Sequence, residues 1–396
     1  MKNESVAILD IRSGEVSFSM GAKGVNGTFV FSDTQTKSYE GFCVEGFLDE
    51  HSFRRAVVSV ITSVRQHYAG VIDEVYVGVP SAFVQVLTKG HTILFPHKRK
   101  ITAQDVEALY ESGLSDLMAN GYCIRHSAMY LSLGDNRKYF SADELYGVST
   151  NLLKGALCYY FVSAEFFELI SGLLEDLSFA SIKFVPSSLA QSVYLISEEK
   201  REGYAFLLDV GFLTTTISVI YGKGIVHEET FNCGVGTILV ALMENLGVDY
   251  PVAEEILASA NISGGSVPKG MVWYNETNND QILVEQINDI IKCSLDVLCE
   301  NVESFFARRY RDKASTILMI NPISITGEGI SCIKGAAEHV AKRLNRLTEI
   351  VAPDLPYYDK PAFSSRIGLL NEATSGQQKK RGLFHRIFNG FGGKKK

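Results

Sequence analysis

A short apolar segment that ends in aspartate occurs twice in this chain, once at the start and once in the second half. VAILD leads to Asp10 and AFLLD leads to Asp209. After each aspartate, the pattern predicts a turn rich in small or hydroxyl residues and then a returning strand. This weak internal repeat predicts two related α/β lobes, each beginning with an antiparallel hairpin.

Length and composition agree with more than one domain. The chain has 396 residues, which is long for a single core. We find no uncharged apolar stretch long enough for a transmembrane helix and no signal-peptide core at the N-terminus, and therefore expect a cytoplasmic protein. The seven cysteines are odd in number and show no CxxC spacing, which argues against a disulfide framework or a zinc site.

Charge is unevenly distributed along the sequence. Residues 379–396 contain seven Lys or Arg and no Asp or Glu, whereas the whole chain has a net charge of −7. An acidic body with a basic end is poorly suited to nucleic acid, so we expect no nucleic-acid partner. A basic end suits an anionic membrane surface.

Hydrophobic spacing predicts an α/β start, with a helix over 52–68 and a strand over 73–80. The segment 81–155 has its own pattern and predicts an inserted α+β unit, in which one strand precedes Lys89-Gly90 and another follows it. Residues 261–281 are rich in Gly, Ser and Asn and predict a loop. The further elements that we expect are strands at 216–221, 225–231 and 316–320 and helices at 103–111, 163–178, 237–246, 282–309 and 336–347.

The turns after the strands carry the candidate chemistry. Asp10 and Asp209 end their strands, where ligand sites of α/β sheets collect, and two facing carboxylates suit Mg²⁺ held through water. The residues after them, which offer backbone N–H groups or hydroxyls to phosphates, are Ser13, Gly14, Gly211, Thr214 and Thr215. A third turn, Gly327-Glu328-Gly329, allows the backbone to approach a ring or ribose closely.

Four segments in order resemble the motifs of the actin/Hsp70/hexokinase superfamily. They are DIRSGEV (10–16), VPSSLA (185–190), DVGFLTTT (209–216) and ITGEGISCIKGAAE (325–338), and they resemble its phosphate-1, connect-1, phosphate-2 and adenosine motifs. Within the superfamily the chain resembles FtsA, a family of bacterial cell-division proteins, and KPAFSSRIGLL (360–370) resembles that family's closing helix. The resemblance spans nearly the whole chain.

The resemblance implies an α/β fold of the actin-like two-lobe ATPase type, with duplicated ribonuclease-H-like domains and an inserted FtsA-type 1C subdomain. The implied divisions are 1A (1–79, 156–199 and 350–370), 1C (80–155), 2A (200–238 and 312–349), 2B (239–311), a linker (371–378) and a membrane-targeting helix (379–396). It also implies ATP with Mg²⁺ in the cleft. The implied nucleotide-site residues are Asp10, Arg12, Ser13, Gly14, Asp209, Gly211, Thr214, Thr215, Gly234, Glu254, Gly327, Glu328 and Gly329, and Asp10 and Asp209 face the metal.

The sequence departs from the family pattern at positions that matter for phosphate. Phe212 and Leu213 replace two glycines of phosphate-2, and Thr216 replaces its last aspartate. Arg12 replaces a glycine of phosphate-1, where it either contacts phosphate or points to solvent. Val185 replaces the connect-1 glutamate. ATP binding and its loss therefore stand as alternatives, and we expect at most a weak ATPase.

The C-terminal residues form an amphipathic pattern. On a helical wheel one face carries Leu383, Phe384, Ile387, Phe388 and Phe391, and Lys or Arg residues flank it. Such a helix lies at the surface of a bilayer, and we prefer this interpretation to a disordered tail or a helix packed on its own protein.

Of three candidate functions, we expect the first. The first is a membrane adaptor of cell division, in which 2B binds the C-terminal peptide of FtsZ, the chain self-assembles into filaments, and the tail binds inner-membrane lipids at the septum. The second is a pilus-assembly scaffold resembling PilM, which binds a membrane protein's cytoplasmic peptide. The third is a metabolic kinase or phosphatase, which the degenerate phosphate-2 motif disfavours.

Overall fold

The computed structural model describes residues 5–24, 26–115, 117, 119–135, 137–263, 268, 270–274, 281–310, 321–330 and 333–375. Within these residues the chain forms two five-stranded sheets and a separate three-stranded sheet, besides two short hairpins. The strand expected at 316–320 and all five apolar residues of the tail lie outside the described residues.

The first sheet has the order β10-β6-β1-β2-β3. Its strands are β1 (Val6–Ile11), β2 (Glu15–Lys23), β3 (Phe29–Ser38), β6 (Glu74–Val79) and β10 (Ser181–Pro186). β1 pairs antiparallel with β2 and parallel with β6. Helices α1 (Glu50–His67) and α3 (Ala164–Asp176) bury their apolar faces in the core beside this sheet. Asp49 begins α1 by accepting the backbone N–H of His51 at its side chain.

The second sheet repeats the first. Its order is β13-β12-β11-β16-β17. As in the first sheet, three neighbouring strands pair antiparallel, here β13, β12 and β11, and two further strands, β16 and β17, add in parallel. The strands are β11 (Tyr204–Val210), β12 (Thr215–Tyr221), β13 (Gly224–Phe231), β16 (Ile323–Thr326) and β17 (Thr348–Ile350). The same order and directions in both sheets confirm the prediction of two related lobes.

A helical layer packs beside the second sheet and extends beyond it. It consists of α6 (Val235–Leu246), α7 (Tyr250–Ser259), α8 (Val284–Arg309) and α9 (Ala336–Arg343). These helices share one apolar core with β11 and β12. The stretch 261–281 is not wholly a loop, because β14 (Val272–Tyr274) and β15 (Gln281–Leu283) form a hairpin there.

The third sheet has the order β7-β9-β8 and carries helix α2 (Ala103–Leu114). Its strands are β7 (Val84–Lys100), β8 (Tyr122–Ser132) and β9 (Ser149–Val162). Thr102 and Asp105 form the capping box of α2. The two strands expected around Lys89-Gly90 are one continuous strand, because β9 pairs along the whole of this segment.

The small elements are the hairpin of β4 (Phe42–Cys43) and β5 (Gly46–Phe47), helices α4 (Ser187–Leu195) and α5 (Glu198–Arg201), and 3₁₀ turns at Ser81–Phe83, Ala142–Glu144 and Pro361–Phe363. Residues 364–375 form the last described helix. This helix packs closely on its surroundings, because a Cβ at Gly78 would lie 2.6 Å from Leu369 and one at Gly368 would lie 2.9 Å from the backbone of Ala190.

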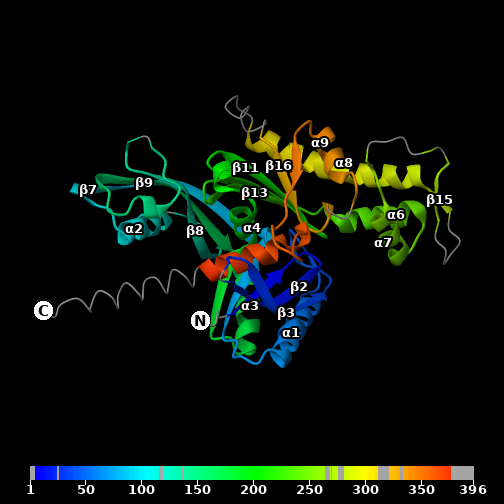
Figure 1. The fold of residues 1–396 in the computed structure, drawn as a ribbon, viewed down its shortest axis with the longest axis horizontal. Coiled ribbons are helices and arrows are strands. Elements are labelled where there is room, and N and C mark those ends of the chain that lie inside the picture. Colours follow the sequence, from blue (N-terminus) through cyan, green and yellow to red (C-terminus); the bar gives the residue numbers. More distant parts are fainter. Residues whose placement is uncertain are drawn as a thin grey trace.

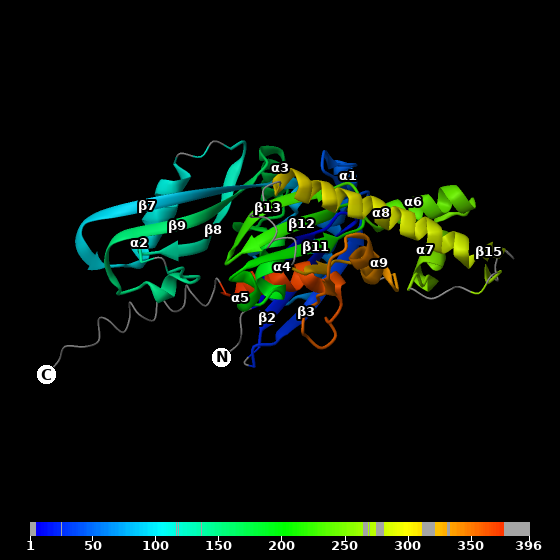
Figure 2. The same ribbon diagram turned by 90° about the horizontal axis from the view of Figure 1, so that it is seen from above.

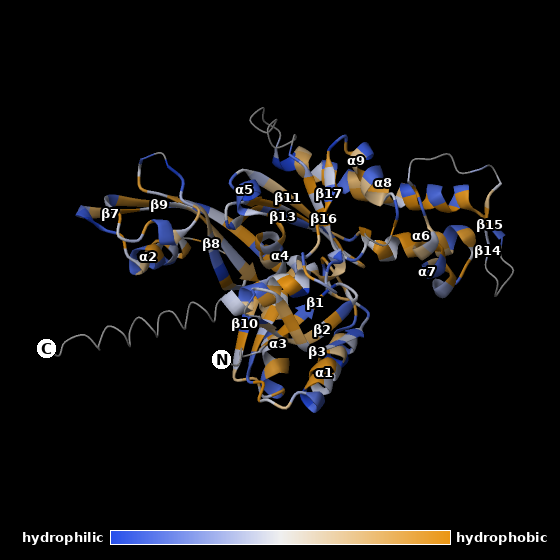
Figure 3. Cartoon of the chain, in the orientation of Figure 1, coloured by the Kyte–Doolittle hydropathy of each residue, from blue (hydrophilic) through white to orange (hydrophobic). Residues whose placement is uncertain are grey.

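Figure 1 shows the two large sheets near the centre of the molecule, with the third sheet at one end of the long axis and α6 and α7 at the other. The view in Figure 2 agrees with this arrangement. In Figure 3, α8 alternates between hydrophobic and hydrophilic residues, as expected for a helix with one buried face. Among the described helices, none is both long and apolar enough to cross a bilayer.

Candidate functional site

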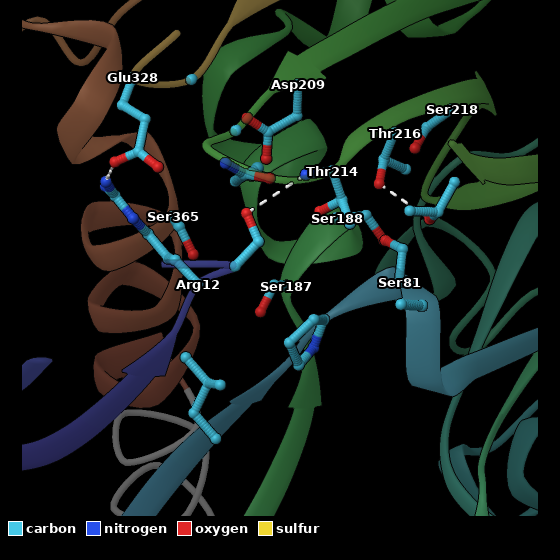
Figure 4. A pocket seen from close by; sticks show the side chains of 18 of the residues that line it. Arg12, Ser81, Ser187, Ser188, Asp209, Thr214, Thr216, Ser218, Glu328 and Ser365 are labelled. Carbon is cyan, nitrogen blue, oxygen red and sulfur yellow. Dashed lines mark hydrogen bonds and ion pairs between the residues drawn. The ribbon is translucent and has the colours of Figure 1, made fainter. Parts of the chain in front are cut away.

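Three turns meet where the two large sheets face each other. The first joins β1 to β2, the second joins β11 to β12, and the third follows β16. β11 and β16 are parallel neighbours that pair Asp209 with Thr326, so the second and third turns lie side by side. A cavity of about 70 Å³ lies between the turns. Figure 4 shows the side chains that surround it.

Arg12 reaches across this cleft from the first turn. Its guanidinium forms an ion pair with Glu328 of the third turn and donates to the carbonyl of Ala362. A second ion pair joins it to Glu15 at 3.2 Å. In Figure 4 the Arg12 side chain points to Glu328, and only 16% of its surface is exposed. Arg12 therefore links the two lobes and does not extend into solvent.

The first and second turns contact each other directly. The hydroxyl of Ser13 accepts the backbone N–H groups of Leu213 at 3.0 Å and Thr214 at 3.4 Å. A Cβ at Gly14 would lie 2.7 Å from Cδ1 of Phe212, so the ring packs onto this glycine. The two bulky residues of the second turn thus pack between the turns rather than leaving a gap.

Three other predicted residues, Gly211, Thr215 and Gly234, make contacts within or beside the second turn. The N–H of Gly211 donates to the carbonyl of Thr214 at 2.9 Å. Thr215 is buried and donates to the carbonyl of Cys233, so its hydroxyl is occupied. Gly234 begins α6 and lies against the backbone carbonyl of Phe212. Glu254 is exposed on α7 and is not among the residues that line the cavity.

The third turn depends on glycine. Gly327 has φ +96°, and its Cα lies so close to Asp209 and to the carbonyl of Val210 that no side chain fits. The N–H of Gly329 donates to the same carbonyl at 2.9 Å. The turn is therefore held to the end of β11.

The two predicted carboxylates approach the cavity from different lobes. Asp10 is buried; its Oδ1 accepts the hydroxyl of Ser365 at 2.5 Å, and its Oδ2 has no hydrogen-bond partner among the described residues. Burial raises the pKa of Asp209, although a hydrogen bond from Gln191 and the charge of Arg12 oppose this shift. These two carboxylates are the ones that would hold Mg²⁺ through water. Within the described residues, no cluster of three or more His, Cys, Asp or Glu is arranged to bind a metal directly.

Several polar residues that line the cavity were not expected from sequence. They are Ser81, Ser187, Ser188, Gln191, Thr216, Ser218 and Ser365. Behind them lies Glu228, whose Oε2 accepts the hydroxyl of Ser218 at 3.1 Å. Burial raises the pKa of Glu228, and the hydroxyls of Ser188, Ser218 and Ser81 lower it only in part. The serines of VPSSLA and KPAFSSRIGLL lie in segments that carry the family resemblance, but the resemblance did not mark them as site residues.

The cavity in the cleft is smaller than a usual pocket for a small molecule. Ligand pockets for small molecules usually measure about 300–1,000 Å³, whereas this cavity measures about 70 Å³. The amides expected to bind phosphate already donate to Ser13, and Arg12 with its ion pairs spans the cleft. The side chains of Arg12, Ser13 and Phe212 therefore occupy much of the space between the three turns.

No protein-family model and no curated protein sequence matches this chain. Solved structures match it in fold. The PilM–PilN type IV pilus biogenesis complex superposes with a TM-score of 0.57 at 13% identity, over 93% of this chain and 98% of the other. MreB5 of Spiroplasma citri bound to AMPPNP gives 0.55 at 9% identity, over 96% and 100% of the two chains.

A third match is the ethanolamine utilization protein EutJ from Carboxydothermus hydrogenoformans, with a TM-score of 0.50 at 10% identity, over 93% of this chain and 90% of that one. At such identities the similarity establishes the fold and not the activity. Together with the repeated sheets and the three apposed turns, these matches show that the chain has the α/β fold of the actin/Hsp70 type.

Proposed function

We propose that this chain is an actin-like scaffold that binds a cytoplasmic segment of a membrane protein and does not depend on ATP hydrolysis. The similarity to the PilM–PilN complex extends over nearly the full length of both chains, which makes a peptide-binding scaffold the natural starting point. The observation that carries the proposal is an open groove on the helical layer, far from the cleft.

The helical groove lies beside α6 and α8 and has a volume of about 640 Å³. It is lined by Ala241, Asn245, Leu283, Glu285, Gln286, Asp289, Ile290, Cys293, Ser294 and Val297. Leu283 is 48% exposed and Val297 is 53% exposed. The lining includes two carboxylates, those of Glu285 and Asp289, and neither Lys nor Arg. The groove is therefore both apolar and acidic.

This combination fits one class of partner. Cytoplasmic segments next to transmembrane helices carry an excess of Lys and Arg together with apolar residues. Such a segment would place its apolar side chains against Leu283 and Val297 and its cations near Glu285 and Asp289. Amphipathic helices commonly bind grooves of this type. We therefore propose a basic amphipathic segment of a membrane protein as the occupant.

Nucleotide has a secondary place in this proposal. MreB5 of Spiroplasma citri has been solved bound to ADP and to AMPPNP, so related folds take nucleotides. In this chain the cleft is filled by side chains, and the second turn lacks the small residues that allow close approach to phosphate. We propose a scaffold that retains the fold and has lost the hydrolytic chemistry.

The groove offers its own chemical probe. Cys293 is exposed in the groove, whereas Cys158, Cys233 and Cys299 are buried. A variant with Cys43, Cys123 and Cys332 changed to serine would carry a maleimide photocrosslinker at position 293. In membranes from the cells that naturally make this protein, we expect the labelled variant to cross-link to a membrane protein through a Lys- or Arg-rich cytoplasmic segment.

The matched charge reversals are Asp289→Lys inside the groove and Glu254→Lys outside it, on the exposed face of α7. We expect Asp289→Lys to lower the cross-linking yield about fivefold or more, because it places like charges against the basic segment. Glu254→Lys should leave the yield unchanged. Cross-links only to a second copy of this chain, or equal yields for both variants, would overturn the proposal.

A second candidate function is the cell-division adaptor, which the basic amphipathic residues 379–396 favour on sequence grounds. In that function the chain would bind FtsZ's C-terminal peptide and assemble on the inner face of the cell membrane. The test is co-sedimentation with anionic liposomes and FtsZ polymers, using the full chain and a chain ending at Gln378. Liposome-dependent sedimentation of FtsZ only with the full chain would support the adaptor. No liposome binding by either chain would exclude a membrane role for the tail.

A further inference from the structure

The interlobe cleft contains a cation that belongs to the chain itself. The Arg12 guanidinium forms ion pairs with the carboxylates of Glu15 and Glu328. Its positive charge also acts to lower the pKa of Asp209. In nucleotide sites of this general kind, Mg²⁺ and phosphate neutralise each other between the lobes. Here an arginine from one turn neutralises carboxylates from the other side without any ligand.

The anion-binding donors of the second turn are also satisfied internally. Successive backbone N–H groups in such a turn form a cavity that suits phosphate oxygens. In this chain the N–H groups of Leu213 and Thr214 point to the hydroxyl of Ser13, which comes from the opposite lobe. A phosphate would have to displace this hydroxyl before it could be bound.

Apolar packing closes the remaining space. Phe212 packs on Gly14, and Leu213 packs on Gly41, where an added Cβ would lie 2.5 Å from Cδ1 of Leu213. Gly41 has φ +93°, which favours glycine and keeps its backbone near the carbonyl of Ser13. Both glycines are in the first lobe and both bulky residues are in the second, so this packing holds the lobes together.

We infer that Arg12, Ser13, Phe212 and Leu213 form an interlobe latch that takes the place of nucleotide and metal in closing the cleft. A ligand that enters must break the Arg12 ion pairs, the Ser13 hydrogen bonds and the Phe212 packing together. Because the latch residues are covalently part of the chain, their effective concentration is high and constant. The closed arrangement is therefore independent of nucleotide supply.

The first experiment measures thermal stability with MgATP or MgADP at about 5 mM, a concentration that strongly stabilises any protein with a micromolar site. We expect no rise in Tm for the wild-type protein. A rise that increases with nucleotide concentration would overturn the inference, because it would show that the closed cleft still exchanges its latch for nucleotide.

The second experiment opens the latch and records hydrogen exchange at residues 209–214 and 327–330. Arg12→Ala should increase exchange at both turns about tenfold, and Arg12→Lys should restore part of the protection because one cation remains. The matched control is Arg54→Ala, which removes an exposed ion pair with Glu50 on α1. Equal exchange in Arg12→Ala and Arg54→Ala would overturn the latch.

A third measurement tests whether the side chains themselves exclude nucleotide. The double variant Arg12→Gly/Phe212→Gly should bind a fluorescent ATP analogue at least tenfold more tightly than wild type, provided that circular dichroism shows a folded protein. Equal binding by the folded double variant and wild type would contradict the inference. None of these readouts uses the helical groove, so failure of the latch and failure of the proposed scaffold function are separate results.

Discussion

The interlobe cleft and the helical groove are opposite kinds of surface in one molecule. The cleft is polar, measures about 70 Å³ and is crossed by ion pairs and hydrogen bonds between the chain's own residues. The groove is apolar and acidic, measures about 640 Å³ and leaves Leu283 and Val297 exposed. The space between the lobes is filled by the chain's own side chains, whereas the groove on the helical layer is open.

The difference indicates where this chain retains the capacity to bind something else. Polar groups that satisfy one another gain little from a ligand, because binding only exchanges one set of hydrogen bonds for another. Exposed apolar side chains gain from any partner that covers them. In the proposed scaffold, an actin-like fold would thus bind a partner on its helical layer without a change of architecture.

The largest expected difference between the cleft and the helical layer is the stability lost when a glycine with positive φ is replaced by alanine. Gly327 has φ +96° and Gly247, which ends α6, has φ +68°. A Cβ would strike Val210 and Asp209 at the first position and meet nothing within 4 Å at the second. We expect Gly327→Ala to cost about 3 kcal/mol and Gly247→Ala about 1 kcal/mol.

Urea denaturation of the two variants measures these costs. The ratio between them is informative, because both variants pay for a left-handed backbone and only Gly327→Ala pays for crowding as well. Equal losses for the two would show that the third turn can move away from β11, and the cleft would then be less tightly built than its contacts indicate.

Glu228 and Asp289 are a buried and an exposed carboxylate, and their replacement should affect the pH dependence of Tm differently. The pKa of Glu228 is raised by burial, so its charged form destabilises the folded protein. This penalty is present above the raised pKa and is lost as pH falls toward the ordinary value of glutamate. Glu228→Gln should therefore raise Tm relative to wild type at about pH 8, and the gain should shrink toward about pH 5.

The control is Asp289→Asn, which removes an exposed carboxylate of the helical groove. Its Tm should follow that of wild type across the same range. If Glu228→Gln behaves like Asp289→Asn, the polar region behind the cavity is hydrated and the carboxylate is not desolvated.

A change in salt concentration should affect the helical groove more than the cleft, and this effect should be smaller than those above. Raising the salt concentration from about 50 mM to about 500 mM should weaken binding of a basic peptide to the helical groove several-fold, because its carboxylates are exposed. Hydrogen exchange at the three turns should change little, because the Arg12–Glu328 pair is mostly shielded from solvent. Salt-induced opening of the turns would mean that screening reaches the latch.

The smallest effect is expected at a surface pair. Arg54 and Glu50 lie one helical turn apart on α1 with side chains 40% and 54% exposed. Arg54→Ala should change the free energy of unfolding by at most about 0.5 kcal/mol. A loss as large as that of Arg12→Ala would show that the two ion pairs are equivalent and that the latch has no special strength.

Much of the fold was predictable because its signals are local. The apolar runs before Asp10 and Asp209 and the spacing over 52–68 identified β1, β11 and α1 within a few residues. The error at β7 has the same origin: Lys89-Gly90 is a local turn signal, and only pairing with the distant β9 keeps the strand continuous. The family resemblance implied that residues of the three turns share one site.

The contents of the cleft were not predictable in the same way. Arg12 and Glu328 are far apart in sequence, and no periodicity shows that they pair. The sequence identified Phe212 and Leu213 as departures from a family pattern, but only the structure places them against Gly14 and Gly41. Glu254 was expected from the family resemblance alone, which gave no information about which way α7 faces, and its place in a nucleotide site stays a prediction.

The third sheet has a consequence for the protein at high concentration. Among the described strands, β7 pairs only with β9, and so presents a long edge on which a strand from another molecule could add. Its last residues include Lys98 and Lys100, and positive charges at such an edge repel an identical strand.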